Sequence, residues 1–136
     1  MRLNPYLSFN GQCETAFKFY EKCLGGKIVM MMRYGESPMA EQTPPDFRNR
    51  IMHVTMDIGG HILQGADVPP QRYEKPQGVF LSLSIQSVDD SERIFAALSD
   101  KGTVQMPLQQ TFWARRFGML IDQFGTPWMI NCENPA

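Results

Sequence analysis

The segment QTFWARRFGMLIDQFGTPWMIN, residues 110–131, contains the pattern that decides the fold. Its centre is a D-x-x-G sequence, from Asp122 to Gly125, placed between two apolar stretches. Such a sequence favours a tight turn that joins two antiparallel strands. A second D-x-x-G sequence, from Asp57 to Gly60, occupies the same position before another strand-like stretch. The recurrence indicates that the chain repeats one structural unit.

The elements around the two turns follow the same order in both halves. The apolar residues Ala16, Phe17 and Tyr20 recur at helical spacing from Gln12 onward, and the glycine pair at 25–26 ends this predicted helix. Alternating patterns predict strands at 4–11, 27–35, 50–58 and 61–67 in the first half, and at 79–85, 103–109, 115–122 and 127–132 in the second, with a proline-containing loop at 35–49. Each half therefore reads as β-α-β-β-β.

A second helix is predicted over residues 88–102, at the matching position of the second half. Asp89 and Glu92 have the spacing of a capping box, which would begin this helix. Ile94, Phe95 and Leu98 are expected to face inward. Phe95 would then correspond to the inward-facing aromatic residue of the first helix.

These elements predict an α+β fold in which two tandem βαβββ modules form a curved mixed sheet with the helices outside. The expected organisation is a single domain, 1–136, with module one at about 3–67, a linker at about 68–77 and module two at about 78–133. A four-stranded sheet with a helix on one face leaves its other face uncovered. Side chains, a partner chain or a ligand must fill that concave face, and we expect a homodimer.

Composition excludes several classes of protein. The 13 basic and 14 acidic residues nearly balance, so no nucleic-acid partner is expected. Three cysteines, at 13, 23 and 132, show no C-x-x-C spacing, which disfavours a disulfide framework and fits a reducing cytoplasm. The N-terminal sequence MRLNPYLSF does not have the form of a secretory signal, and no stretch reaches the ~20 apolar residues of a membrane span. A cytoplasmic protein without a membrane partner is therefore expected.

Several motifs carry a resemblance to a known family. They are PYLSFNG, AFKFYEKCLGG, MHVTMDIGGHIL leading to Asp67, and the segment at 110–131. With the repeated βαβββ plan, they resemble the vicinal oxygen chelate, or glyoxalase/bleomycin resistance/dioxygenase, superfamily and its PhnB-like branch. The resemblance covers residues 5–131. That branch is often labelled 3-demethylubiquinone methyltransferase-like, but the chain has no glycine-rich loop after a strand that could hold a methyl donor.

The resemblance also implies where a metal would be bound. Metalloenzymes of this superfamily take His, Gln or Glu ligands from the first and last strands of each half. In this chain those strands offer Tyr, Ser, Phe, Trp and Met at most of these positions, and Gln64 and Asp67 are the plausible donors. We therefore expect no metal and no other cofactor, which argues against glyoxalase-type isomerisation.

His53 is the candidate acid or base. It lies in a predicted strand on the same face as Ile51 and Thr55, and imidazole titrates near neutral pH. The alternative is a structural histidine held by hydrogen bonds. Asp67 either forms a cap or turn, or is a carboxylate that faces His53. In the functional reading, Asp67 and Gln64 support His53 and contact the ligand.

Trp113 and Arg116 are the candidate ligand contacts of the second half. Arginine resists burial without a partner, so an arginine stacked on Trp113 at the rim of a cavity would suit a flat or anionic ligand. A dimer contact is the alternative, because interfaces are enriched in both residue types. Trp128 is expected in the core.

The leading functional hypothesis is a PhnB-like protein that binds a small organic molecule in a concave cleft, with metal-independent chemistry at His53. One alternative is a non-catalytic binder that sequesters a planar toxic compound, as the resemblance to bleomycin-resistance proteins implies. The other alternative is a metal-dependent lyase or isomerase with unusual ligands.

Overall fold

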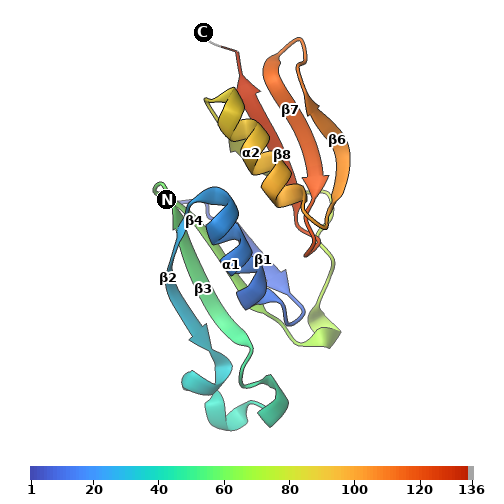
Figure 1. Cartoon of the computed structure of the whole chain (residues 1–136). Helices are drawn as coiled ribbons and strands as arrows, with labels where there is room; N and C mark the ends of the chain where they lie inside the picture. Colours follow the sequence, from blue (N-terminus) through green and yellow to red (C-terminus); the bar gives the residue numbers. More distant parts are fainter. Residues whose placement is uncertain (135–136) are drawn as a thin grey trace. The chain divides into compact units, whose positions relative to one another are not determined.

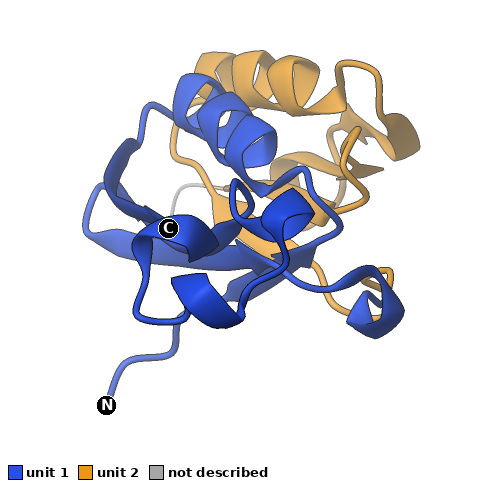
Figure 2. Ribbon diagram, turned by 90° about the horizontal axis from the view of Figure 1, so that it is seen from below, with its two compact units in different colours: residues 1–74 blue, residues 75–136 orange. Residues whose placement is uncertain are grey.

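The computed structural model describes residues 1–134, and it divides into two compact units, 1–74 and 75–136 (Figure 2). The first unit contains module one and the second contains module two. Each unit has its own four-stranded sheet and one α-helix. The predicted α+β fold with two tandem βαβββ modules is therefore confirmed, and each module is treated separately below.

Module one follows the predicted order of elements. It comprises β1 (Tyr6–Phe9), α1 (Cys13–Leu24), β2 (Lys27–Arg33), β3 (Ile51–Ile58) and β4 (His61–Asp67) (Figure 1). The strand order is β1-β4-β3-β2, with β1 parallel to β4 and the other pairs antiparallel. The segment predicted as a loop contains three short 3-10 turns, η1 (Tyr34–Glu36), η2 (Ala40–Gln42) and η3 (Pro45–Phe47). A fourth, η4 (Pro70–Arg72), follows β4.

The helix α1 covers one face of the module one sheet. Its apolar residues Phe17 and Tyr20 are fully buried, and Gly25 ends the helix in the left-handed conformation at φ 72°. Phe17 packs directly on Gly65 of β4, where an added Cβ would lie 2.7 Å from Phe17 Cε1. Glycine at this position therefore lets the aromatic ring approach the strand backbone.

Module two repeats this topology. It comprises β5 (Leu81–Ser84), α2 (Val88–Ser99), β6 (Thr103–Gln109), β7 (Ala114–Ile121) and β8 (Pro127–Glu133), in the strand order β5-β8-β7-β6. Phe95 of α2 packs on Gly118 of β7, where an added Cβ would lie 2.7 Å from Phe95 Cε2. The predicted inward-facing residues Phe95 and Leu98 are buried, whereas Ile94 is half-buried.

The start of α2 differs from the capping box predicted at Asp89 and Glu92. The N-cap is Ser87, whose backbone is extended and whose hydroxyl accepts a hydrogen bond from the Asp90 amide at 3.1 Å. Serine is a strong N-cap because its short side chain reaches the free amides of the first turn. Asp89 therefore lies inside the first turn, where its charge faces the positive end of the helix dipole.

The D-x-x-G turn of module two is held by a buried aspartate. Asp122 Oδ1 accepts from the amides of Phe124 and Thr126, at 2.8 and 3.0 Å, and Oδ2 accepts from Trp128 Nε1 at 2.8 Å. Trp128 is 1 % exposed, which confirms its prediction as a core residue. The turn is thus fixed to the core by the side chain that begins it.

Candidate functional site

The sheet of module one has two faces of different chemistry. Gly65 of β4 lies beneath the Phe17 ring of α1, and Val54 of β3 is paired with Gly65. Val54 and Gly65 therefore lie on the sheet face that α1 covers. Side chains alternate between faces along a strand. His53, Thr55 and Gln64 therefore lie on the face opposite α1.

A hydrogen-bonded histidine occupies this open face. His53 Nδ1 lies 3.1 Å from the Tyr6 hydroxyl oxygen, and His53 Nε2 lies 3.0 Å from Thr55 Oγ1. The Tyr6 and His53 rings are also in contact, with centroids 5.6 Å apart. The histidine is therefore oriented from both ring nitrogens.

The protonation of Tyr6 indicates how the protons are arranged. Burial raises the pKa of the Tyr6 phenol, with smaller contributions from Cys13 and Tyr34, so the hydroxyl keeps its proton beyond its usual range. A protonated Tyr6 hydroxyl can donate to His53 Nδ1, and in the imidazole tautomer that matches this donation, Nε2–H donates to Thr55 Oγ1. This tautomer leaves Nδ1 as the basic atom.

The surroundings of His53 combine polar and apolar groups. Gln64 lies opposite Thr55 on β3 and opposite Tyr6 on β1. Met30 and Met32 of β2 lie opposite Thr55 and His53. Tyr6 is 50 % exposed and Met30 is 40 % exposed, so a small molecule could reach this surface. A carboxamide, a phenol, an imidazole and flexible thioethers suit an organic molecule with both polar and apolar parts.

Asp67 lies on the other face and has the capping role. Its side chain is 1 % exposed, and Oδ1 accepts from the amides of Gly11 and Cys13, at 2.9 and 3.0 Å. Oδ2 accepts from the amide of Ile51 at 2.9 Å. Asp67 thus ties the start of α1 and the start of β3 to the end of β4. The alternative placement, a carboxylate facing His53, is wrong because the side chain points toward α1. The ligand contact expected of Asp67 stays a prediction.

Cys13 lies in the same region, and its thiol is held in the protonated form. Burial raises the pKa of its thiol, and the nearby carboxylates of Asp67 and Glu14 raise it further. The thiolate is therefore disfavoured despite the position at the start of a helix.

Trp113 and Arg116 lie in module two and point to different groups. Trp113 is 46 % exposed and makes edge-to-face contacts with Phe112 and Phe117, at centroid distances of 4.8 and 5.3 Å. Arg116 Nε instead lies 3.2 Å from Glu92 Oε1 on α2. The structure therefore places Arg116 against the helix rather than on the tryptophan. Of the predicted site residues, only His53 and Gln64 lie together, on the face of the module one sheet opposite α1.

The residues of the open face do not fit the metal site that the superfamily implies. Both nitrogens of His53 are engaged with hydroxyl groups, and Asp67 points to the other face. Within residues 1–134, no group of three or more His, Cys, Asp or Glu side chains is placed to hold a metal ion. A divalent cation requires several such donors in one place. We therefore derive no step through a metal, and the expected independence from cofactors stays a prediction.

Two functional neighbours of His53 were not singled out from the sequence. Thr55 follows at the i+2 position of the same strand, so strand alternation alone could have identified it. Tyr6 is 47 residues away in sequence. Its contact with His53 depends on the packing of β1 beside β4, which no local pattern reveals.

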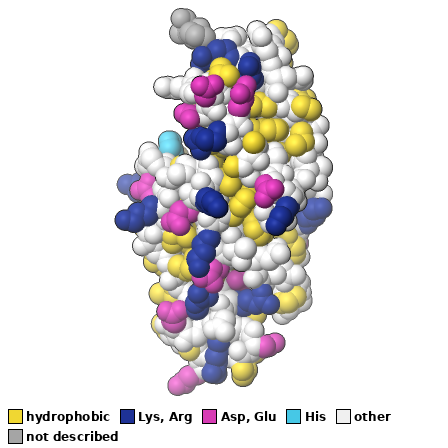
Figure 3. Space-filling view, in the orientation of Figure 1, with side chains coloured by type: hydrophobic (Ala, Val, Ile, Leu, Met, Phe, Trp, Pro, Cys, Tyr) yellow, Lys and Arg dark blue, Asp and Glu magenta, His cyan; other side chains and the backbone are white. Residues whose placement is uncertain are grey.

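The surface gives no sign of a large charged interface on the side drawn in Figure 3. Basic and acidic side chains are intermixed there, among scattered apolar ones. The expectation of no nucleic-acid partner stays a prediction. In the part of the chain that the structure describes, no helix is long and apolar enough to cross a membrane.

Comparisons with known proteins agree with the sequence resemblance. The model of the Glyoxalase/Bleomycin resistance protein/Dioxygenase superfamily matches residues 2–130. Protein YjdN of Escherichia coli strain K12 is 36 % identical over 139 residues, which cover 96 % of this chain and 95 % of that protein.

Solved structures give the same result. The crystal structure of PA1353 from Pseudomonas aeruginosa has a TM-score of 0.90 and 43 % identity, covering 99 % of both chains. The PhnB protein of Bacillus cereus has a TM-score of 0.83 and 22 % identity, covering 97 % of this chain and 99 % of the other, which shows a shared fold. The chain belongs to the glyoxalase/bleomycin resistance/dioxygenase superfamily.

Proposed function

We propose that module one binds a small organic molecule on its open sheet face and exchanges a proton with it through Tyr6 and His53. The observation that carries this proposal is the hydrogen-bonded series Tyr6–His53–Thr55 on the face opposite α1. A histidine with a purely structural role would satisfy its hydrogen bonds in the same way. However, the exposed phenol at one end of this series gives the imidazole a route to a bound molecule.

The proton would move in one direction along this series. Tyr6 accepts a proton from the bound molecule while its own hydroxyl proton passes to His53 Nδ1, which leaves an imidazolium ion. Thr55 Oγ1 continues to accept from Nε2–H and so orients the charged ring. Gln64, opposite both Tyr6 and Thr55, would hold the polar part of the molecule. Met30 and Met32 would contact its apolar part.

The test combines a binding screen with variants of His53 and Tyr6 and a control variant of His61. A panel of small organic metabolites is screened by thermal shift, because a molecule that binds the folded state raises the melting temperature. Each hit is then incubated with the wild type, His53→Gln and Tyr6→Phe, and its conversion or its exchange of C–H protons with solvent deuterium is followed by NMR. His61→Gln is the matched control, because His61 is an exposed residue at the β3–β4 turn.

We expect His53→Gln to bind the hits and to lose proton exchange by about 100-fold or more, a typical contribution of general acid–base catalysis. His61→Gln should behave as the wild type. Exchange that is equally fast in His53→Gln would contradict the catalytic role and would favour a non-catalytic binder. A divalent metal found in stoichiometric amounts by elemental analysis of the purified protein would contradict the metal-independent proposal.

We also propose that the chain forms a homodimer in the cytoplasm. Phe112 is 93 % exposed and lies against Trp113, which supports a contact with a second copy, because exposed aromatic pairs are unusual on a monomer. The three cysteines are free and buried, which suits a reducing compartment. Light scattering of Phe112→Ser and Trp113→Ser variants tests the dimer. Monomers are expected, and an unchanged mass would leave Trp113 as a proposed ligand contact instead.

A further inference from the structure

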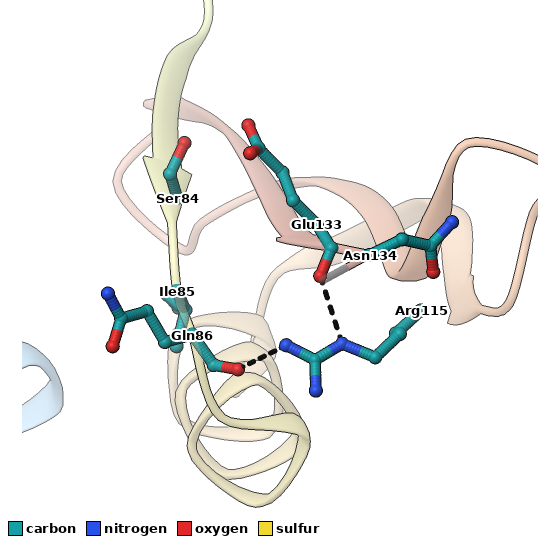
Figure 4. Close-up of a pocket in the computed structure, with 6 residues that line it drawn as sticks. All are labelled: Ser84, Ile85, Gln86, Arg115, Glu133 and Asn134. Atoms are coloured by element: carbon teal, nitrogen blue, oxygen red, sulfur yellow. Dashed lines mark hydrogen bonds between the residues drawn. The ribbon is translucent and has the colours of Figure 1, made fainter. Parts of the chain in front are cut away.

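Module two contains a hollow that the proposed function does not use. It lies where β5 and β8 end, has a volume of about 420 Å³, and is lined by Ser84, Ile85, Gln86, Arg115, Glu133 and Asn134 (Figure 4). This volume falls within the range of small-molecule sites, which is roughly 300–1,000 Å³. Every lining residue except Ile85 has a polar or charged side chain, so a polar ligand is the appropriate class to consider.

A β-bulge in β7 determines the direction of Arg115, the positively charged residue of this hollow. Ala114 pairs with Glu133 and Arg116 pairs with Cys132, so Arg115 is an extra residue in β7 that has no partner in the register. Bulges re-aim a side chain relative to the regular alternation of a strand. Here the bulge turns Arg115 toward the ends of β5 and β8, while the next residue, Arg116, pairs with α2.

The guanidinium of Arg115 is fixed by two backbone carbonyl groups. Nε donates to the Glu133 carbonyl at 2.9 Å, and Nη2 donates to the Gln86 carbonyl (Figure 4). Within residues 1–134, Nη1 has no such protein acceptor, and in Figure 4 it points away from both carbonyl groups. Because the side chain is already immobilised, an anion that binds Nη1 would not have to order it.

An opposite charge lies across the hollow. The Glu133 carboxylate extends on the side of Ser84 rather than toward the guanidinium (Figure 4). Its nearest side-chain hydrogen bond, from Asn131 Nδ2, is long at 3.5 Å, so the carboxylate keeps most of its acceptor capacity. The two formal charges of the lining therefore cancel but remain separated. The ligand that matches this pattern carries both signs of charge.

We propose that this hollow is a second small-molecule site, for a small zwitterion that carries a carboxylate and an ammonium group. The carboxylate binds Nη1 of Arg115, and the ammonium group binds the Glu133 carboxylate. The Ser84 hydroxyl, which faces the same space, can bind either group. The site lies within module two and does not depend on the proposed role of His53.

The test is an NMR titration of the ¹⁵N-labelled full chain with glycine, β-alanine and 4-aminobutyrate. Acetate and methylammonium are the matched probes that carry one charge each. We expect saturable shifts of the amides of residues 84–86, 115 and 133 with at least one zwitterion, and weaker binding of both single-charge probes. Shifts that do not saturate below about 100 mM for any zwitterion would overturn the proposal, because such binding is weaker than any specific site gives.

Two variants test the negative and the positive group of the hollow one at a time. Glu133→Gln keeps the exposed position and the shape of the side chain, and it should weaken zwitterion binding by about tenfold, a typical effect of removing one charge of a pair. Acetate binding should not weaken. Arg115→Lys keeps the positive charge but loses the planar group that bridges the two carbonyls, so its melting temperature is measured alongside binding.

His53→Gln is the control in the other module and should bind the zwitterion as the wild type does. If Glu133→Gln leaves zwitterion affinity unchanged, or if acetate binds as tightly as the zwitterion, the proposed ligand class is wrong. A dispersed spectrum confirms that each variant is folded.

Discussion

The two modules share one topology but present different chemistry on the corresponding faces of their sheets. In module one, Tyr6 of the first strand pairs with Gln64 of the last. In module two, the equivalent parallel pair is Ser82 with Met129. The antiparallel neighbours differ in the same way, because Thr55 pairs with Gln64 in module one, whereas Met119 pairs with Met129 in module two.

The histidine position shows the same contrast. His53 is two residues before Thr55 on β3, and the residue two before Met119 on β7 is Phe117, which contacts Trp113. Module one thus carries His53, Thr55 and Gln64 where module two carries an aromatic ring and two thioethers, and only the Tyr6 position keeps a hydroxyl group, in Ser82. A repeated fold fixes where side chains point, while the residue at each position decides whether that place can do acid–base chemistry.

The aspartates that stabilise the two modules also occupy different places. Asp67 connects the ends of three distant segments, and Asp122 holds a turn of its own hairpin. Each carboxylate is buried and accepts three hydrogen bonds from N–H groups. Hydrogen bonds to a buried charged acceptor contribute more than neutral ones.

The largest expected effect comes from removing these carboxylates. Asp67→Ala should lower the free energy of unfolding by about 3–5 kcal/mol, because three buried amides lose their acceptor. Asp122→Ala should lower it by a similar amount. Native-state hydrogen exchange separates the two variants: amides at the start of α1 and β3 should exchange faster in the first, and amides of the β7–β8 hairpin in the second.

Asp67→Asn is the control for charge, because it keeps one carboxamide oxygen in nearly the same place. Its free energy of unfolding, measured by chemical denaturation, should lie between those of the wild type and Asp67→Ala. A loss below about 1 kcal/mol for Asp67→Ala would mean that the amides find water instead, and the assigned capping role would be of little consequence.

A smaller effect is expected at the two glycines beneath the helix aromatics. Gly65→Ala places a methyl group 2.7 Å from Phe17 Cε1 and 2.8 Å from the Leu7 carbonyl oxygen. Gly118→Ala places one 2.7 Å from Phe95 Cε2 and 3.0 Å from Leu108 Cα. Each should cost about 1–3 kcal/mol, the range for overpacked cores. If adding Phe17→Leu to the first variant, or Phe95→Leu to the second, restores part of the lost stability, the clash is with the aromatic ring. Without such relief, the strand backbone is the cause.

The smallest effect concerns the ion pairs that join helix to sheet. Glu14 of α1 lies 2.9 Å from Arg33 and 3.0 Å from Lys18, and the hydrogen bond from Arg33 is the main cause of a lowered pKa for Glu14. The stability from this pair is therefore present above the ordinary pKa of 4.5 and is lost as the pH falls toward the lowered value. We expect this pair to contribute about 0.5–1 kcal/mol to the free energy of unfolding at neutral pH.

The corresponding pair in module two, Arg116 with Glu92, is longer at 3.2 Å and has a more exposed carboxylate. Glu14→Gln should therefore cost more at pH 7 than Glu92→Gln, and the difference should be smaller near pH 3, because the pH has then fallen from the ordinary pKa of 4.5 toward the lowered pKa of Glu14. Urea denaturation at both pH values measures it. Equal costs at pH 7 would show that the two pairs contribute alike.

Much of the fold could be predicted because it is encoded in local patterns. The strands at 61–67 and 103–109 have the predicted bounds, and both D-x-x-G turns join the predicted strands. Glycine and apolar periodicity reveal such elements without knowledge of the tertiary structure. The first residue of α2, Val88, matches the prediction, but the N-cap was placed two residues too late, at Asp89 instead of Ser87. Both residues are good caps, and the choice depends on where the chain leaves β5.

The site was harder to predict because it depends on register. Strand alternation places His53 and Thr55 on one face, but the side on which Asp67 lies follows from the pairing of β4 with β1 and from the start of α1. Trp113 and Arg116 were expected together. A bulge at Arg115 shifts the alternation between them, and single bulges leave no mark in the sequence pattern.

The most direct test of the difference between the modules is to add each hit from the metabolite screen to the ¹⁵N-labelled wild type and to Tyr6→Phe. The amide chemical shifts that change are then mapped by NMR. The account predicts shifts centred on the amides of Tyr6, His53, Thr55 and Gln64, and a weaker or altered pattern in Tyr6→Phe. A screen in which no hit shifts these module one amides, or in which those shifts are unchanged when the Tyr6 hydroxyl is removed, would contradict it.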